Sequence, residues 1–484
     1  MRVDTAIYLR WMSRRTAITC SLLLIVIGGI VSLNTFQGPM INRNVLAATS
    51  EPMLGTPGGP PETIKTTQPI VCDSNLLIDR MALTVMTGTT RCLSTFSTQL
   101  VTSLRCIREP ILLSTLNSTL GKHQIYDALR DCDPQVMNES ADLEMYRKQK
   151  KMMATGDELS VGSVDDAGTP SAEKQLEKYM PLHAIERAWA LQPDRDWYIF
   201  IGSSVWLSAR SVQSALSNYN PQIKLWFGSF ATESTGEVDV FDNTFILSSA
   251  AVRAIAVDHT GLGRRWDERI SALKDARTVL AVALGEELDI RVKDRAVLLD
   301  HEKPALISFG MATWCREVMS LGGLDSRQFD TMYQLQMKSH DQRVSFRDLY
   351  HQEAPQGVPF KLEDWDNRAE DHTYLLNIVN NDANTIKGQW EPNNLVDPHS
   401  TFQNCELACI QNRECFQFSF VVTILELTNT SGECFLSSVF RIGETRKPEI
   451  WGAESENGKG WTSGWRSDRI ARWVADNARC DDET

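Results

Sequence analysis

Residues 197–206 carry the most informative pattern in the sequence, because an apolar run there ends on small polar residues. The run Trp197–Ile201 predicts a buried strand, and Gly202, Ser203 and Ser204 predict the turn that follows it. An acidic pair in such a turn could hold a divalent metal ion, since hard cations prefer carboxylate oxygens. This turn contains no carboxylate, so we expect it to hold no metal ion.

The elements around this turn alternate between strands and helices. Apolar runs predict strands at Met81–Thr87, Ile111–Leu113, Trp197–Ile201, Ile223–Phe227, Phe245–Leu247 and Ile290–Val292. Helical periodicity predicts helices at residues 89–105, 174–192, 249–257 and 270–286. The alternation indicates an α/β fold with a mainly parallel sheet, whose ligands bind at the carboxyl ends of the strands. Residues 150–173 lack periodicity and are predicted to be a disordered surface insertion.

The N-terminal segment predicts the compartment. Thr16–Leu33 is uncharged and just long enough to cross a bilayer, and four arginines precede it against one aspartate. We therefore expect a cytoplasmic tail at residues 1–15, a signal anchor at 16–33 and a type II topology. A signal peptide cleaved near Ala47 is the alternative. Residues 34–70 are rich in Pro, Gly and Thr and predict a flexible stem.

Composition agrees with a lumenal protein of the Golgi or endoplasmic reticulum. The net charge of -13 argues against a nucleic-acid partner. Three sequons, at Asn117, Asn138 and Asn429, are candidate glycosylation sites. Five cysteines crowd into the tail and are predicted to form disulfides: Cys405, Cys409, Cys415, Cys434 and Cys480. A zinc site at the first three of these is the rival interpretation, but their spacing does not form paired knuckles.

Six short segments occur in an order that resembles one enzyme family. They are Met86-Thr87-Gly88, Leu104-Arg105-Cys106, residues 193–201, Leu225-Trp226-Phe227-Gly228-Ser229, Phe245-Ile246-Leu247-Ser248 and Trp314-Cys315. Together they resemble glycosyltransferase family 31, the Fringe-like and β-1,3-galactosyltransferase group, and especially its fungal branch. The resemblance implies a GT-A-like, Rossmann-type α/β domain at residues 71–345. The tail resembles a small disulfide-rich PAN or apple-like domain, at residues 390–484, after a linker at 346–389.

The resemblance also implies a chemistry. Family members transfer a sugar from a UDP-sugar to a hydroxyl of a glycan or glycoprotein acceptor, and Mn²⁺ stabilises the leaving diphosphate. An acidic side chain removes the acceptor proton. By resemblance, the donor-binding residues would be Thr87, Gly88, Gly228, Ser229 and Trp314.

Two departures from the family pattern remove the metal ligands. Ser204 stands where the family has its metal-binding aspartate, with Gly202 at the start of the same turn. The histidine pair of the family is replaced by Gly322-Gly323. We therefore predict no metal cofactor, because carboxylate and imidazole ligands are both missing.

Two further departures affect acceptor binding and proton transfer. Residues 241–244 replace a glycine-rich acceptor loop, and Ala276-Arg277 replace an acidic pair at a helix start. Asp275 lies just before that helix and is the one candidate catalytic base. A solvated acid at a helix N-terminus is the alternative, which the helix dipole also favours.

Other polar and aromatic residues have simpler interpretations. Asp194 and Asp196 lie at the start of a predicted strand, on the wrong end of the sheet for a metal pair, and are expected to be solvated. His301 and His340 lack partners at ligand spacing and are expected on the surface. Trp206 and Trp314 could stack on a sugar ring, but packing in the core is the better interpretation.

Two hypotheses follow. The chain is a secretory-pathway glycosyltransferase of family 31 type whose activity is weak or absent. Alternatively, it is a non-catalytic relative that binds glycans or proteins as a chaperone or scaffold.

Overall fold

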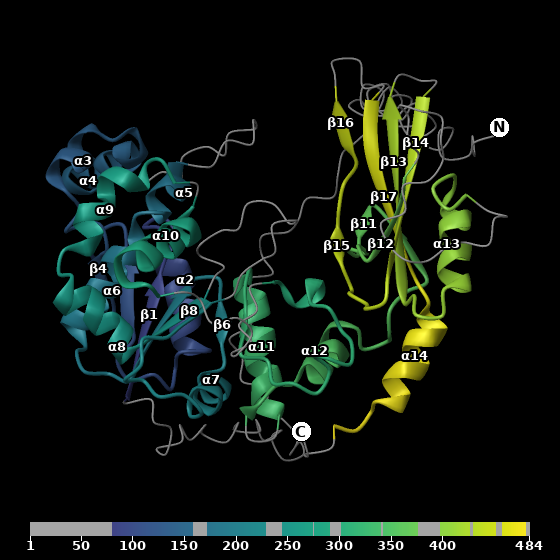
Figure 1. Cartoon of the computed structure of the whole chain (residues 1–484), viewed down its shortest axis with the longest axis horizontal. Coiled ribbons are helices and arrows are strands. Elements are labelled where there is room, and N and C mark those ends of the chain that lie inside the picture. The colour runs from purple at the N-terminus through teal and green to yellow at the C-terminus, as the bar shows by residue number, and fades with distance from the viewer. Residues whose placement is uncertain are drawn as a thin grey trace, which may run out of the picture. The chain divides into compact units, whose positions relative to one another are not determined.

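The computed structural model describes residues 80–157, 172–228, 244–273, 275–290, 302–339, 342–375, 397–425, 429–451 and 457–480. All of them belong to one compact unit, Asp73–Thr484. These residues form one seven-stranded sheet, one six-stranded sheet and two small two-stranded sheets (Figure 1).

The seven-stranded sheet has the order β3-β4-β2-β1-β5-β8-β7. Its four consecutive strands β4, β2, β1 and β5 are parallel, whereas β3, β8 and β7 pair antiparallel with their neighbours. The strands are β1 Met81–Met86, β2 Ile111–Ser114, β3 Ser118–Leu120, β4 His123–Asp127, β5 Trp197–Gly202, β7 Trp226–Gly228 and β8 Thr244–Ser248.

Both faces of this sheet are covered. Tyr198 and Phe200 of β5 face one apolar core, and Trp197, Ile199 and Ile201 face the other, as expected for side chains that alternate along a strand. Burial on both sides explains why β5 is a continuous apolar run rather than an alternating one. The helices in this part of the chain are α2 Cys92–Val101, α3 Pro134–Glu139, α4 Glu144–Thr155, α5 Ala172–Glu177, α6 Met180–Leu191, α7 Ala209–Leu216, α8 Ser249–Arg253, α9 Leu262–Ile270 and α10 Ala276–Leu288.

The second large sheet is antiparallel and lies toward the C-terminus. Its order is β10-β17-β13-β14-β12, with β16 also paired to β17. The strands are β10 Lys361–Glu363, β12 His372–Leu375, β13 Gln417–Leu425, β14 Asn429–Ser437, β16 Glu449–Trp451 and β17 Asn457–Trp465, flanked by helices α13 Phe402–Gln411 and α14 Ser467–Asp476. Residues 346–375, predicted as part of a linker, contribute α12 Phe346–Glu353, β10 and β12.

An aromatic cluster joins the segment after residue 302 to this C-terminal part. Phe309 and Phe440 exchange backbone hydrogen bonds of 2.8 and 3.2 Å. The ring of Trp314 packs edge-on against Trp473 of α14, with centroids 4.9 Å apart. Cys315 forms a disulfide with Cys480 close by. The remaining elements of the region are η7 Pro304–Leu306, α11 Ser326–Lys338 and the two-stranded pairs β6 Trp206–Leu207 with β9 Ser320–Leu321 and β11 Trp365–Asp366 with β15 Glu444–Thr445.

The predicted fold class is wrong. The chain is a mixed α/β protein with several sheets and disulfides, rather than a Rossmann-type parallel sheet with a small module attached. A buried apolar run does not by itself fix the direction of its neighbour, so the sequence pattern did not reveal that β8 runs antiparallel to both β5 and β7. Of the helices in the described residues, none is long and apolar enough to cross a bilayer. The predicted membrane segment, residues 16–33, lies outside the described residues.

Two local predictions also differ from the structure. Residues 150–155, placed in a disordered insertion, form the last part of α4, and residues 158–171 lie outside the described residues. The single helix expected over 174–192 is divided into α5 and α6, and Pro181 occupies the first turn of α6, where its missing N–H is tolerated.

Candidate functional site

The candidate site lies where β1 and β5 end side by side. These strands are parallel and Met86 is in register with Gly202, so Thr87 and Ser203 follow at adjacent positions. The Ser203 hydroxyl donates a hydrogen bond of 2.8 Å to the Thr87 hydroxyl oxygen, and both residues are buried. The backbone N–H of Thr87 donates to the carbonyl of Leu113 in β2. The hydroxyls of Thr87 and Ser203 are therefore joined to each other at this edge.

A second turn from far along the chain meets the end of β5. Trp206 of β6 pairs with Leu321 of β9, and the N–H of Leu324 donates to the carbonyl of Ser204 at 2.9 Å. We call residues 202–205 and 322–324 the sheet-edge turns. They bring together the two segments in which the family resemblance places its metal ligands. Neither turn contains a carboxylate, a thiol or an imidazole.

Lys303 fills the space beside Gly323. A Cβ atom on Gly323 would lie 2.9 Å from Cγ of Lys303, and the backbone φ of +63° at Gly323 is one that side chains rarely adopt. The Lys303 ammonium reaches Oε2 of Glu444 at 2.8 Å. A histidine at position 323 would therefore meet both a strained backbone and an occupied space.

Glu302, which is half-buried, directly precedes Lys303. Its backbone carbonyl accepts a hydrogen bond of 3.2 Å from the N–H of Gly322. Burial raises the pKa of the Glu302 carboxyl, while the positive charges of Arg441 and Arg368 act in the opposite direction. The group is thus coupled electrostatically to the arginines of the C-terminal part.

Of the other predicted site residues, Asp275 and Trp314 have structural roles elsewhere. Asp275 caps α10, because its Oδ1 accepts hydrogen bonds of 2.8 Å from both the N–H and the hydroxyl of Thr278. Trp314 is buried in the aromatic cluster, and its Nε1 donates to the carbonyl of Asn477 at 2.8 Å. Gly88 follows Thr87 at the end of β1, and Gly228 ends the edge strand β7. Ser229 lies outside the described residues.

The structure also describes several residues that were not predicted to form the site. Trp206 is fully buried in the same apolar cluster as Trp314. Asp196 pairs with Arg80 at 2.6 Å, at the start of β5. Asn117 and Asn138 of two sequons are exposed. The structure does not describe His301, His340, residues 241–243 or the side chain of Asn429.

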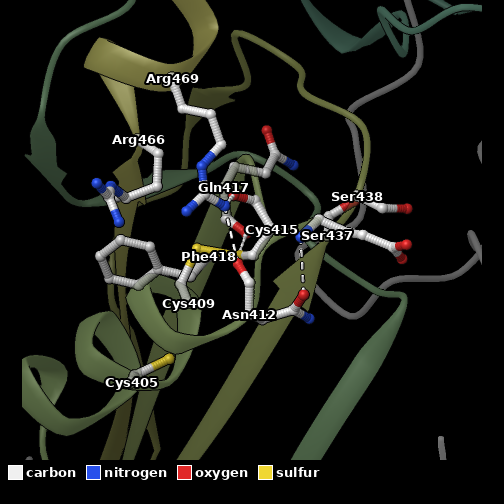
Figure 2. Close-up of a disulfide and its surroundings, with 12 residues drawn as sticks. Cys405, Cys409, Asn412, Cys415, Gln417, Phe418, Ser437, Ser438, Arg466 and Arg469 are labelled. Carbon is white, nitrogen blue, oxygen red and sulfur yellow. Dashed lines mark hydrogen bonds between the residues drawn. A yellow bond between two sulfur atoms is a disulfide. The ribbon is translucent and has the colours of Figure 1, made fainter. Parts of the chain in front are cut away.

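All five tail cysteines form disulfides. Cys405 is bonded to Cys434, which ties α13 to β14. Cys409 is bonded to Cys415, which closes a short loop after α13 (Figure 2). Cys480 pairs with Cys315, outside the tail. Arg469 of α14 donates to the carbonyl oxygens of Asn412 at 2.8 Å, Arg413 at 3.0 Å and Cys415. The loop is thus fixed by one covalent bond and by the guanidinium of Arg469.

One group of buried polar residues was not predicted from the sequence. Cys132 precedes α3, His183 lies on α6 and Asp267 lies on α9, and all three are buried. His183 Nε2 is 2.8 Å from Asp267 Oδ1 and 3.4 Å from Cys132 Sγ, and the sulfur lies 3.9 Å from the same oxygen. We call this group the Cys-His-Asp cluster.

The only local signal for this cluster was periodicity. On α9 the buried positions include Leu262, Trp266 and Ile270, and Asp267 occupies the same face. His183 similarly lies among apolar residues at the buried start of α6. A polar residue at an apolar position of a helix indicates a buried partner, but it does not identify that partner.

Comparison with known proteins adds no assignment. No protein-family model matches the sequence, and no curated protein is significantly similar to it.

Proposed function

We propose that this chain is a secretory-pathway protein related to the family 31 glycosyltransferases that no longer performs metal-dependent sugar transfer and instead binds glycans or glycoproteins. Disulfides among Cys315, Cys405, Cys409 and their partners support an oxidising compartment, because such bonds are rare where thiols are kept reduced. The exposed sequon residues Asn117 and Asn138 are consistent with that location.

One observation carries the proposal: the sheet-edge turns meet, and neither of them contains a carboxylate, a thiol or an imidazole. The N–H of Leu324 donates to the Ser204 carbonyl, so the two segments are adjacent in space. At the positions where the family resemblance expects metal ligands, these segments carry serine and glycine. A single substitution could be an accident, whereas losses on both turns point to relaxed selection for the metal.

The consequence for catalysis follows from charge. When a UDP-sugar reacts, negative charge grows on the departing diphosphate, and a cation or fixed positive group must offset it. Lys303 is the nearby cation, but its ammonium already pairs with Glu444. Asp275, the one candidate base, already accepts two hydrogen bonds as a helix cap. Neither of these groups is positioned to supply the missing chemistry.

Calorimetry on the purified full-length chain tests the first half of the proposal. UDP is titrated into the protein with and without Mn²⁺, and we expect no heat that depends on the metal. The matched variant Ser204→Ala should give the same traces, because the wild-type hydroxyl binds no metal. Metal-enhanced binding of UDP, or sugar transfer that a chelator abolishes, would contradict the proposal.

A glycan array tests the second half. The same protein, labelled at its amino groups, is applied to an array of N-linked and O-linked glycans. We expect saturable binding to a subset of them that is unchanged by Ser204→Ala and by addition of a chelator. Absence of binding to every glycan would remove the carbohydrate-binding function and leave only a protein partner.

A further inference from the structure

We propose that Cys132, His183 and Asp267 form a buried binding site for one divalent transition-metal ion, and that zinc is its best match. The three side chains come from a turn and two helices that are far apart in sequence. Their ligand atoms Sγ, Nε2 and Oδ1 nevertheless converge within 4.8 Å of one another. Figure 1 shows that α6 and α9, which carry two of them, lie on the same side of the seven-stranded sheet.

The spacing of the three atoms is that of ligands around a small cation. Zinc–ligand bonds of about 2.0–2.3 Å in a tetrahedron place the ligand atoms roughly 3.3–3.6 Å apart. The sulfur–nitrogen distance of 3.4 Å already falls in that range. The nitrogen–oxygen distance of 2.8 Å would have to widen and the sulfur–oxygen distance of 3.9 Å would have to shorten, each by about half an ångström.

Neighbouring groups hold the ligands in orientation. Oδ2 of Asp267 accepts a hydrogen bond of 2.7 Å from the backbone N–H of Asp133, which leaves Oδ1 directed toward His183 and Cys132. The imidazole of His183 lies against Gly263 of α9, where a Cβ atom would be only 2.9 Å from Nδ1. Such supporting contacts are typical of metal sites, because they fix the ligand atoms before the ion arrives.

The charge of the cluster also matches a divalent ion. A Cys132 thiolate and an Asp267 carboxylate carry two negative charges beside a neutral imidazole. A thiol that binds a divalent cation gives up its proton to solvent, so Cys132 would bind the ion as a thiolate.

The set of ligand types narrows the choice of ion. Thiolate and imidazole are soft and borderline ligands that suit zinc, whereas calcium and magnesium take oxygen ligands almost exclusively. Three protein ligands leave one coordination position for water, as in zinc sites that are not purely structural. The alternative to a metal site is a hydrogen-bonded network in which His183 and Cys132 both share one oxygen of Asp267.

Metal content distinguishes the two alternatives. The purified full-length chain is incubated with zinc chloride, passed through a desalting column and measured by plasma mass spectrometry. We expect about one zinc ion per chain in the wild type, and at least a tenfold lower content in Cys132→Ser. The matched control is Cys92→Ser, because Cys92 is the other buried unpaired cysteine of the described residues and belongs to a different part of the core.

A cobalt spectrum keeps the proposal testable even if Cys132→Ser fails to fold. Cobalt(II) in the wild-type site should give a thiolate-to-metal charge-transfer band that zinc then removes, and Cys92→Ser should keep the band. Absence of the band in folded wild type would overturn the proposal, as would equal zinc content in wild type and folded Cys132→Ser. The site is remote in sequence from the sheet-edge turns, so this result is independent of the UDP experiments.

Discussion

The sheet-edge turns and the Cys-His-Asp cluster offer opposite combinations of position and chemistry. The turns lie at the carboxyl ends of parallel strands, where α/β proteins commonly bind ligands, yet they present only serine, glycine and apolar side chains. The cluster lies among α6, α9 and the turn before α3, away from any motif, yet it presents a thiol, an imidazole and a carboxylate within 4.8 Å. Topology therefore places a site, but individual side chains decide whether that site can bind a cation.

The largest difference between the two regions should appear in stability. Asp267→Ala removes the oxygen shared by His183 and Cys132 and leaves the N–H of Asp133 without its partner. Because these groups are buried, we expect a loss of about 3 kcal/mol or more in the free energy of unfolding. Ser204→Ala should cost about 1 kcal/mol or less. Urea unfolding at neutral pH measures both, and similar losses in the two variants would contradict this ranking.

The second prediction concerns the introduction of metal-ligand side chains into the sheet-edge turns. The double variant Ser204→Asp with Gly323→His restores the ligand types that the family resemblance expects at the sheet-edge turns. We expect no Mn²⁺-enhanced UDP binding, because the new imidazole meets the side chain of Lys303 and a φ of +63°. The strain should lower the free energy of unfolding by about 2 kcal/mol.

A triple variant tests whether Lys303 is the obstacle at position 323. Adding Lys303→Ala frees the space beside position 323 and should recover part of the lost stability. Recovery of metal-dependent UDP binding only in the triple variant would identify Lys303 as the group that closes the site. Mn²⁺-enhanced UDP binding by the double variant alone would show that Lys303 does not block a ligand at position 323.

The third prediction compares one substitution on two helices. Gly263→Ala on α9 places a methyl group 2.9 Å from Nδ1 of His183 and should displace the imidazole. We expect a loss of about 1–2 kcal/mol and lower zinc content. Gly285→Ala on α10 meets nothing within 4 Å, and should stabilise the protein by about 0.5–1 kcal/mol. Thermal unfolding with and without zinc would show opposite shifts; a stabilising Gly263→Ala would contradict the packing of the imidazole on α9.

The strands that could be predicted are those whose burial is indicated by a local run of apolar residues. Trp197–Ile201 is apolar without interruption because β5 is central and covered on both faces, and the predicted and observed strands differ there by one residue. The direction of the neighbouring strand β8 could not be predicted from the same kind of run, because a buried apolar run does not by itself fix the direction of its neighbour. The sequence pattern therefore did not predict that the sheet is mixed.

The two regions differ in predictability for a related reason. The turn at Gly202–Ser204 could be found because a strand and its turn are contiguous in sequence. The Cys-His-Asp cluster joins residues separated by 51 and 84 positions, and no local spacing relates them. Asp275 is the reverse case. Its position before a helix could be predicted from the sequence, but only the structure shows that the N–H and the hydroxyl of Thr278 donate to its carboxylate.

The smallest expected effect is a pair of opposite pH dependences, one from each region. Burial raises the pKa of Glu302 above its usual 4.5, so the folded state binds its proton more tightly than the unfolded state does. The contribution of Glu302 to the free energy of unfolding is therefore complete at acidic pH and is lost as the pH rises above 4.5. The free energy of unfolding of Glu302→Gln should increase relative to that of the wild type over that range.

Asp133, beside the Cys-His-Asp cluster, has a lowered pKa because the N–H of Gln135 donates to its carboxylate. The contribution of Asp133 to the free energy of unfolding is present above the usual aspartate pKa of 3.8 and disappears as the pH falls. The free energy of unfolding of Asp133→Asn should therefore decrease relative to that of the wild type as the pH rises. Urea midpoints of both variants from about pH 3 to about pH 7 measure the two slopes; equal signs would mean that burial does not dominate at Glu302.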